Sequence, residues 1–263
     1  QGRGLAPFLA WHGVEVFVVD YRGAGRSDVP VEGVGFEGLL EGEAEAALAR
    51  ALRGRERIGV GGCGLGGTLA LLLAARHPER VAGVVGLQAA VTLDFPNEPL
   101  AAVAPLARRA PAWLDLRRAL AAELFSGRSW FEILLANDGS IRGAALPALR
   151  RATLAPLSRT MLSELAGYMA AGEIRIGGRD LREQLGAWRG PGVFFVASRD
   201  NWIHPEFSLP LAELLPAAQT EFRLLNPLEG ARHEYGHLGM LLGEDASRDV
   251  WEPALSFLKE AVR

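Results

Sequence analysis

The chain has 263 residues, of which 49% are hydrophobic and 22% are charged, and its formal net charge at pH 7 is −3. This length and composition can bury one substantial core, so we expect one domain with an elaborate insertion. The slightly acidic balance excludes the positive field that attracts nucleic acids, and we expect no nucleic-acid partner.

The sequence also lacks the marks of a disulfide-rich or membrane protein. Its single cysteine, Cys63, excludes an internal disulfide framework and a cysteine zinc site, so we expect a reducing, cytoplasmic compartment. The longest strongly apolar run, "TLALLLAA", is far shorter than the ~20 residues that span a bilayer. The opening "QGRGLAPFLAWHG" lacks the basic and apolar segments of a signal peptide. We therefore expect no transmembrane segment and no leader.

The first third of the chain alternates strand and helix patterns. After the helical opening, "VEVFVVD" at 14–20 is apolar on both faces, as in a buried strand, and "YRGAGRSD" is a glycine-rich loop. Helical spacing covers 37–53, with acidic residues early and arginines late. A strand at 57–62, a helix at 65–77 and a strand at 81–90 follow.

Residues 96–190 have a different texture, rich in Ala, Leu, Arg and Pro, with helical periodicity and no convincing strand. We interpret them as a helical lid inserted into a core formed by 1–95 and 191–263. The lid carries several large aromatic residues, which either cover an apolar pocket or form the core of the lid itself. They are Trp113, Phe125, Trp130 and Phe131.

The strand signature returns at 191–200 and at 220–227, with a helix between them at 209–216 and a last helix at 247–262. Strand–helix alternation on both sides of a helical block predicts an α/β protein with a parallel, doubly wound sheet and a helical insertion. Ligands of such sheets bind beyond the carboxyl ends of the strands.

Four motifs follow the strands in a characteristic order: "DYRGAGRSD", "GCGLGG", "FVASRDNWIHPE" and "YGHLGMLLGEDASRDVW". In this order the sequence resembles the α/β-hydrolase superfamily over nearly its whole length. The last motif is especially similar to the acid-lipase branch. The "GGT" after the turn is similar to polyhydroxyalkanoate synthases, whose nucleophile is cysteine.

The resemblance implies that Asp200 is the triad acid and His237 the general base. The chemistry suits these residue types, because an imidazole takes the proton of a nucleophile and a carboxylate holds the imidazole in the right tautomer. Alternatively, Asp200 caps the following helix and His237 is a structural hydrogen-bonding residue. His233 is a rival base but lacks the "GHL" context. We expect no metal and no cofactor. The remaining histidines, His12, His77 and His204, are expected to be structural or surface residues.

The nucleophile is missing from its expected place. Aligning "GCGLGG" with the family's G-x-S-x-G-G turn puts Gly64 at the apex, where glycine adopts the strained backbone easily but offers no nucleophile. Cys63 is the alternative, because a thiolate is reactive and a nearby helix N-terminus lowers its pKa. We expect, however, that the residue before the apex points elsewhere, with its sulfur separated from His237.

An oxyanion hole is also incomplete in the sequence. The backbone N–H of Leu65, directly after the apex, is one expected donor, but the loop that supplies the family's second donor precedes the first helix. The His12-Gly13 pair cannot replace it, because it leads directly into the strand expected at 14–20. Two explanations remain open: the chain lacks the early strands with that loop, or it is a degenerate member.

The sequence thus predicts an ester- or lipase-like hydrolase of lipophilic acyl substrates whose activity is weak or lost. Removal of a triad serine costs about a million-fold in turnover. The alternatives are a pseudoenzyme that binds an acyl ligand or a partner protein, and a Cys63-dependent acyltransferase.

Overall fold

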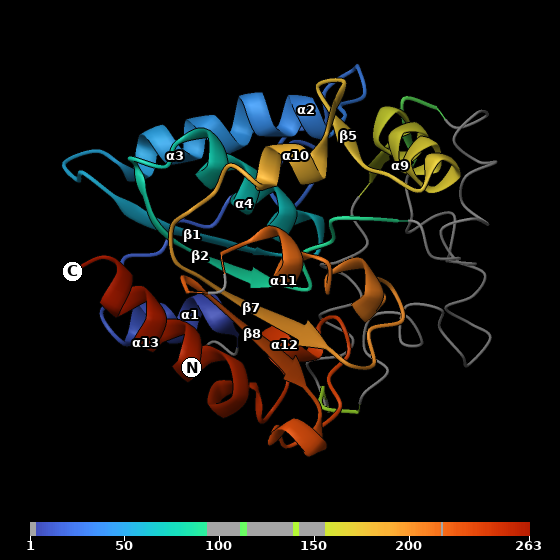
Figure 1. The fold of residues 1–263 in the computed structure, drawn as a ribbon. Coiled ribbons are helices and arrows are strands. Elements are labelled where there is room, and N and C mark those ends of the chain that lie inside the picture. Colours follow the sequence, from blue (N-terminus) through green and yellow to red (C-terminus); the bar gives the residue numbers. More distant parts are fainter. Residues whose placement is uncertain (1–3, 94–110, 115–138, 142–155, 217) are drawn as a thin grey trace.

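The main sheet of the protein has four parallel strands in the order β1-β2-β7-β8 (Figure 1). A computed structural model describes residues 4–93, 111–114, 139–141, 156–216 and 218–263, and the strand count refers to these residues. The strands are β1 (Ile58–Cys63), β2 (Val81–Leu87), β7 (Gly192–Ala197) and β8 (Thr220–Leu225). They confirm the four strands predicted after residue 56 and the parallel sheet.

Helices cover both faces of this sheet (Figure 1). The first face carries α2 (Phe36–Leu39), η1 (Leu40–Ala44), α3 (Glu45–Ala51), α4 (Leu65–Arg76), α10 (Leu181–Leu185) and α11 (Leu211–Leu214). The second face carries α1 (Leu5–Trp11), α12 (Gly239–Leu242), η5 (Ser247–Trp251) and α13 (Glu252–Ala261). Short turns of helix, η3 (Pro205–Phe207) and η4 (Pro227–Glu229), follow β7 and β8. The helices predicted at 37–53, 65–77, 209–216 and 247–262 are therefore present.

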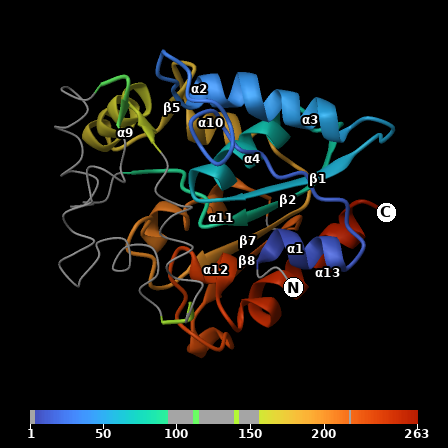
Figure 2. The ribbon, with the colours of Figure 1, turned by 180° about the vertical axis from the view of Figure 1, so that it is seen from behind.

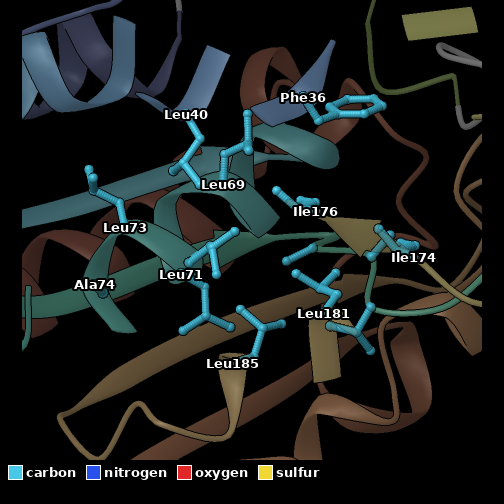
Figure 3. Close-up of a cluster of buried hydrophobic side chains, with 14 of the residues drawn as sticks. Phe36, Leu40, Leu69, Leu71, Leu73, Ala74, Ile174, Ile176, Leu181 and Leu185 are labelled. Carbon is cyan, nitrogen blue, oxygen red and sulfur yellow. The ribbon is translucent and has the colours of Figure 1, made fainter. Parts of the chain in front are cut away.

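Strand alternation divides the apolar core into two layers. Val84 and Phe194 pack against the helices of the first face, whereas their neighbours Val85 and Phe195 pack on the second, because successive side chains of a strand point to opposite faces. Figure 3 shows the first layer, where leucines of α4 meet side chains of α2, η1 and α10. Burial between sheet and helices explains why α4 is apolar on nearly every side.

The strand predicted at 14–20 is wrong. Residues of this segment belong to no strand, and the side chains of Phe17, Val18 and Val19 are 40%, 73% and 36% exposed. A strand exists only where a neighbouring strand takes up its backbone N–H and C=O groups, and an apolar sequence does not supply that neighbour.

The described part of 96–190 contains more strand than predicted. β3 (Trp113–Leu114) pairs with β4 (Leu157–Ser158), and β5 (Arg175–Ile176) with β6 (Arg179–Asp180), each as an antiparallel pair of two-residue strands. Strands of this length leave almost no periodic signal, so the expectation that this segment has no convincing strand is corrected here.

The helix α9 (Arg159–Ala171) lies beyond the ends to which the strand arrows point (Figures 1 and 2). In contrast, Leu181 and Leu185 of α10 are fully buried in the same core as α4. The division into core and lid stays a prediction, and Phe125, Trp130 and Phe131 lie outside the described residues. In the described part of the chain, no helix is long and apolar enough to cross a membrane.

Candidate active site

A sharp turn joins β1 to α4, as predicted from the glycine-rich sequence. Its apex, Gly64, has φ 58° and ψ −130°, a region that residues with a Cβ rarely adopt. A Cβ on Gly62 would lie only 2.5 Å from the carbonyl carbon of Gly66, so the close approach of strand and helix also requires glycine there. The backbone N–H of Gly64 donates to the carbonyl of Leu87 in β2 at 2.8 Å, which ties the turn to the sheet.

Asp200 lies in the loop after β7 and is 2% exposed. Its Oδ1 accepts hydrogen bonds from the backbone N–H groups of Trp202 and Ile203, both at 2.9 Å. Its Oδ2 lies 2.6 Å from Nδ1 of His237. The carboxylate is therefore buried but fully engaged, as a buried charge has to be.

His237, in the loop after β8, is 9% exposed. Because a carboxylate only accepts hydrogen bonds, Nδ1 of His237 donates to Asp200 and Nε2 is left as the basic nitrogen. Burial by itself would lower the pKa of His237, but Cys63 and the Asp200 carboxylate together raise it well above its ordinary value.

The turn and the two loops converge on one place. A Cβ built on Gly64 would lie 3.1 Å from Cε1 and 3.4 Å from Nε2 of His237, and 3.2 Å from Cδ1 of Ile203. The structure thus brings together the three positions that the sequence placed in one site: Gly64, Asp200 and His237. Their catalytic roles remain predictions.

Cys63 lies closer to the base than expected. Its Sγ is 3.7 Å from Nε2 of His237 and 3.9 Å from the carbonyl oxygen of the same residue. The expectation that this side chain is separated from His237 is therefore wrong. The histidine loop lies over the end of β1, so the imidazole reaches both the apex and the residue before it.

Leu65 is the first residue of α4. The first N–H groups of a helix have no acceptor within the helix, so that of Leu65 is available as an oxyanion donor, and this role stays a prediction. Among the residues that the structure describes, no group of three or more His, Cys, Asp or Glu side chains is placed to hold a metal ion.

The other four histidines lie outside this convergence. His233, the rival base, has its Nε2 2.5 Å from Asp245. His77 contacts Glu45 at 2.9 Å at the end of α4. His12 hydrogen-bonds the carbonyl of Phe8 on the exposed side of α1, and His204 lies 5.8 Å from the ring of Phe207, centroid to centroid.

Two residues of this region were missed from the sequence. Ile203 lies beside the apex, and Gln88, at the end of β2, hydrogen-bonds the loop that carries Asp200. An apolar loop residue leaves no signal of such a contact. Gln88 does leave a signal in the sequence, because it is a polar residue directly after the apolar strand segment "VAGVVGL", all of which is buried.

Comparisons with known proteins identify the family and the fold of the chain. The family model described as alpha/beta hydrolase fold matches residues 2–225. Similar solved structures include a thermophilic esterase from Thermogutta terrifontis, with 21% identity, a TM-score of 0.61, and coverage of 92% of this chain and 79% of the esterase.

Two further structures are similar to the chain. The monoacylglycerol lipase of Paleococcus ferrophilus has 18% identity and a TM-score of 0.62, over 98% of this chain and 87% of the lipase. The enol-lactonase of Burkholderia xenovorans has 20% identity and a TM-score of 0.61, over 91% of this chain and 78% of the lactonase. A search of curated protein sequences finds no match. With a family match over most of its length and a parallel sheet that carries the turn, acid and histidine in order, the chain belongs to the α/β-hydrolase family.

Proposed function

We propose that the protein is a slow hydrolase of lipophilic acyl esters, in which His237 activates a water molecule beside Gly64. The observation that carries the proposal is the geometry of the base. Nδ1 of His237 is 2.6 Å from Asp200, and Nε2 is 3.4 Å from the place that a side chain on Gly64 would occupy. Similar structures described as an esterase and a monoacylglycerol lipase support this reaction class.

The proposed reaction needs no group beyond these residues and water. Nε2 of His237 takes a proton from water while the water oxygen adds to the acyl carbon. The oxyanion faces the N–H of Leu65, and the ester C–O bond then breaks as the imidazolium returns the proton to the leaving alcohol. Asp200 stabilises the imidazolium throughout.

We expect this reaction to be slow, because the site lacks a nucleophilic side chain at the apex of the turn. In a serine protease, loss of the nucleophile costs about a million-fold in turnover, and the remaining thousand-fold or more comes from binding and oxyanion stabilisation. For the substrate, we propose that the part of the predicted lid around α9 covers the carboxyl ends of the strands, which favours a lipophilic acyl group.

The test is hydrolysis of p-nitrophenyl butyrate by wild type and His237→Ala. We expect slow turnover above the buffer rate that His237→Ala abolishes. The matched control is His233→Ala, which removes the histidine of another His–Asp pair and leaves turnover unchanged. Turnover that survives His237→Ala contradicts the proposal. Absence of turnover across acyl chain lengths, with acyl ligands still bound, favours the pseudoenzyme alternative.

The second candidate function is acyl transfer through Cys63. The observation in its favour is the 3.7 Å distance between Sγ and Nε2 of His237, which is compatible with proton transfer from the thiol to the imidazole. The thiolate would add to the acyl carbon and expel the alcohol, which takes the proton from the imidazolium. Water or a second alcohol would then release the thioester.

Because Cys63 is the only cysteine, thiol labelling reports on one site. Acyl transfer through Cys63 would give an acyl adduct on Cys63 by mass spectrometry after mixing with p-nitrophenyl butyrate, and Cys63→Ala would lose turnover. If Cys63→Ala retains turnover and no adduct forms, the water mechanism is favoured over the thioester.

A further inference from the structure

Gln88, the residue after β2, has an unusual backbone. Its φ is 50°, and among the described residues it is the only non-glycine residue with positive φ. Such a conformation is strained for a residue with a Cβ and persists only where the surroundings hold it in place. Here the backbone N–H of Gln88 donates to the carbonyl of Phe195 in β7 at 2.8 Å, which extends the pairing of β2 and β7 by one residue.

The side chain of Gln88 is fully buried and both ends of its amide are bonded. Nε2 donates to the carbonyl of Ile203 at 2.7 Å, and Oε1 accepts from the N–H of Ala197 at 2.6 Å. The orientation of the amide is determined, because a backbone N–H requires an acceptor and a carbonyl requires a donor. One side chain therefore holds both ends of the segment 197–203.

This segment carries the acid of the site. Asp200 lies in its middle and accepts from the N–H of Ile203, while the carbonyl of Ile203 receives the amide of Gln88. On the other side, the carbonyl of Leu87, in the peptide that precedes Gln88, receives the N–H of Gly64. Gln88 is thus bonded to the acid loop and is linked through one peptide to the turn at the apex.

We propose that Gln88 is a positioning residue that sets the place of Asp200, and through it of His237, relative to Gly64. An amide is suited to this role because it offers a donor and an acceptor at one end, which match the buried carbonyl of Ile203 and the buried N–H of Ala197. An apolar side chain of similar volume would fill the space but leave both backbone groups without these partners.

The test compares Gln88→Met with Gln184→Met. Gln184 donates to the carbonyls of Ile176 and Arg179 away from the site, so its variant is a control for the loss of a partly buried glutamine that bonds two backbone carbonyls. By NMR titration we expect the pKa of His237 to fall toward its ordinary value in Gln88→Met and to remain raised in Gln184→Met. A purely structural role would lower the melting temperature of both variants without moving this pKa.

The kinetic part of the test rests on the proposed function. For p-nitrophenyl butyrate we expect kcat of Gln88→Met to fall by about 100-fold with a smaller change in KM, because small displacements of catalytic groups have effects of this size. If wild type hydrolyses no ester, the proposed function fails, but the titration of His237 still tests the positioning role.

Gln88→Glu provides a second variant should Gln88→Met not fold. A protonated carboxyl can donate to Ile203 and accept from Ala197, whereas the ionised form repels the carbonyl of Ile203. We expect the His237 signals to resemble wild type at low pH and to shift as Glu ionises. A raised His237 pKa that is unchanged in either folded variant overturns the proposal.

Discussion

The turn at 62–66 and the two loops that carry Asp200 and His237 depend on their side chains in opposite ways. Gly64 adopts the strained apex with little steric cost, so the turn keeps its shape without any reactive group. The Asp200–His237 pair is buried, and removal of either partner would leave the other without its hydrogen bond. The backbone shape of the turn therefore does not depend on a reactive side chain. In the Asp200–His237 pair, by contrast, the same hydrogen bond holds the two side chains in place and orients the base.

The largest effect is expected from returning a nucleophile to the turn. We expect Gly64→Ser to raise p-nitrophenyl butyrate hydrolysis by about 1000-fold, less than the roughly million-fold contribution of a triad serine in a serine protease, because the added side chain is crowded against His237. The added Cβ meets His237 at 3.1 Å, and the strained φ should cost about 1–3 kcal/mol in unfolding free energy. Stopped-flow or plate kinetics together with urea unfolding measure both effects.

Gly64→Ala is the matched control for this gain. It carries the same Cβ and the same strain but no hydroxyl, so it should lose stability without gaining activity. A fluorophosphonate probe should label Gly64→Ser and not Gly64→Ala. Equal activity of the two variants would show that the turn does not present its apex to the base.

The pair can be tested in the background of Gly64→Ser. We expect Asp200→Asn to cancel the gain, because the corresponding change in a serine protease costs about 10,000-fold through the wrong histidine tautomer. The measurement is kcat/KM of the double variant. If most of the gained activity survives, Asp200 does not serve as the orienting acid, and its bonds to the N–H groups of Trp202 and Ile203 are its main role.

The pH dependence of hydrolysis tests the protonation state of His237 in the Asp200–His237 pair. His237 has to be neutral at Nε2 to act as base, and its pKa is raised above the ordinary 6.5. Hydrolysis should therefore increase as pH rises through that raised pKa, so the acidic limb of the profile lies above pH 6.5. Cys63→Ala removes one of the groups that raise the pKa and should move the limb to lower pH, provided that turnover survives.

The same shift affects stability. Because the folded protein binds the proton of His237 more tightly than the unfolded chain, this stabilisation is complete below about pH 6.5, the pKa of an unfolded histidine. It is lost as pH rises through the folded-state pKa. Urea unfolding of wild type and His237→Gln across this range measures the difference, and parallel curves for the two proteins would contradict the raised pKa.

The smallest effects are expected at two helix N-caps outside the pair. Ser158 is fully buried, and its Oγ accepts from the N–H groups of Val34 and Thr160, so Ser158→Ala should cost about 1–2 kcal/mol. Asp180 caps α10 at a partly exposed position, and Asp180→Ala should cost about 0.5–1 kcal/mol. Urea unfolding gives both values, and equal costs would show that the burial of Ser158 adds nothing.

The sequence predicted most of the core elements, because apolar periodicity and glycine placement are local properties. It also carried a signal that was missed: "RIGGRD" at 175–180 pairs β5 with β6 around Gly177 and Gly178, both at positive φ, as expected for a two-residue hairpin loop. The strand predicted at 14–20 is absent, because a strand has to pair with a neighbouring strand, and a local apolar pattern does not show whether that neighbour exists.

In the site, the resemblance of the ordered motifs to the α/β-hydrolase superfamily placed Gly64, Asp200 and His237 together, which agrees with the meeting of the carboxyl ends of parallel strands at one edge of the sheet. The proximity of Cys63 to His237, the contact of Ile203 with the apex and the bonds of Gln88 were decided by tertiary structure. These contacts join segments more than a hundred residues apart, and their distances depend on how the loops after β2, β7 and β8 pack, which no local pattern encodes.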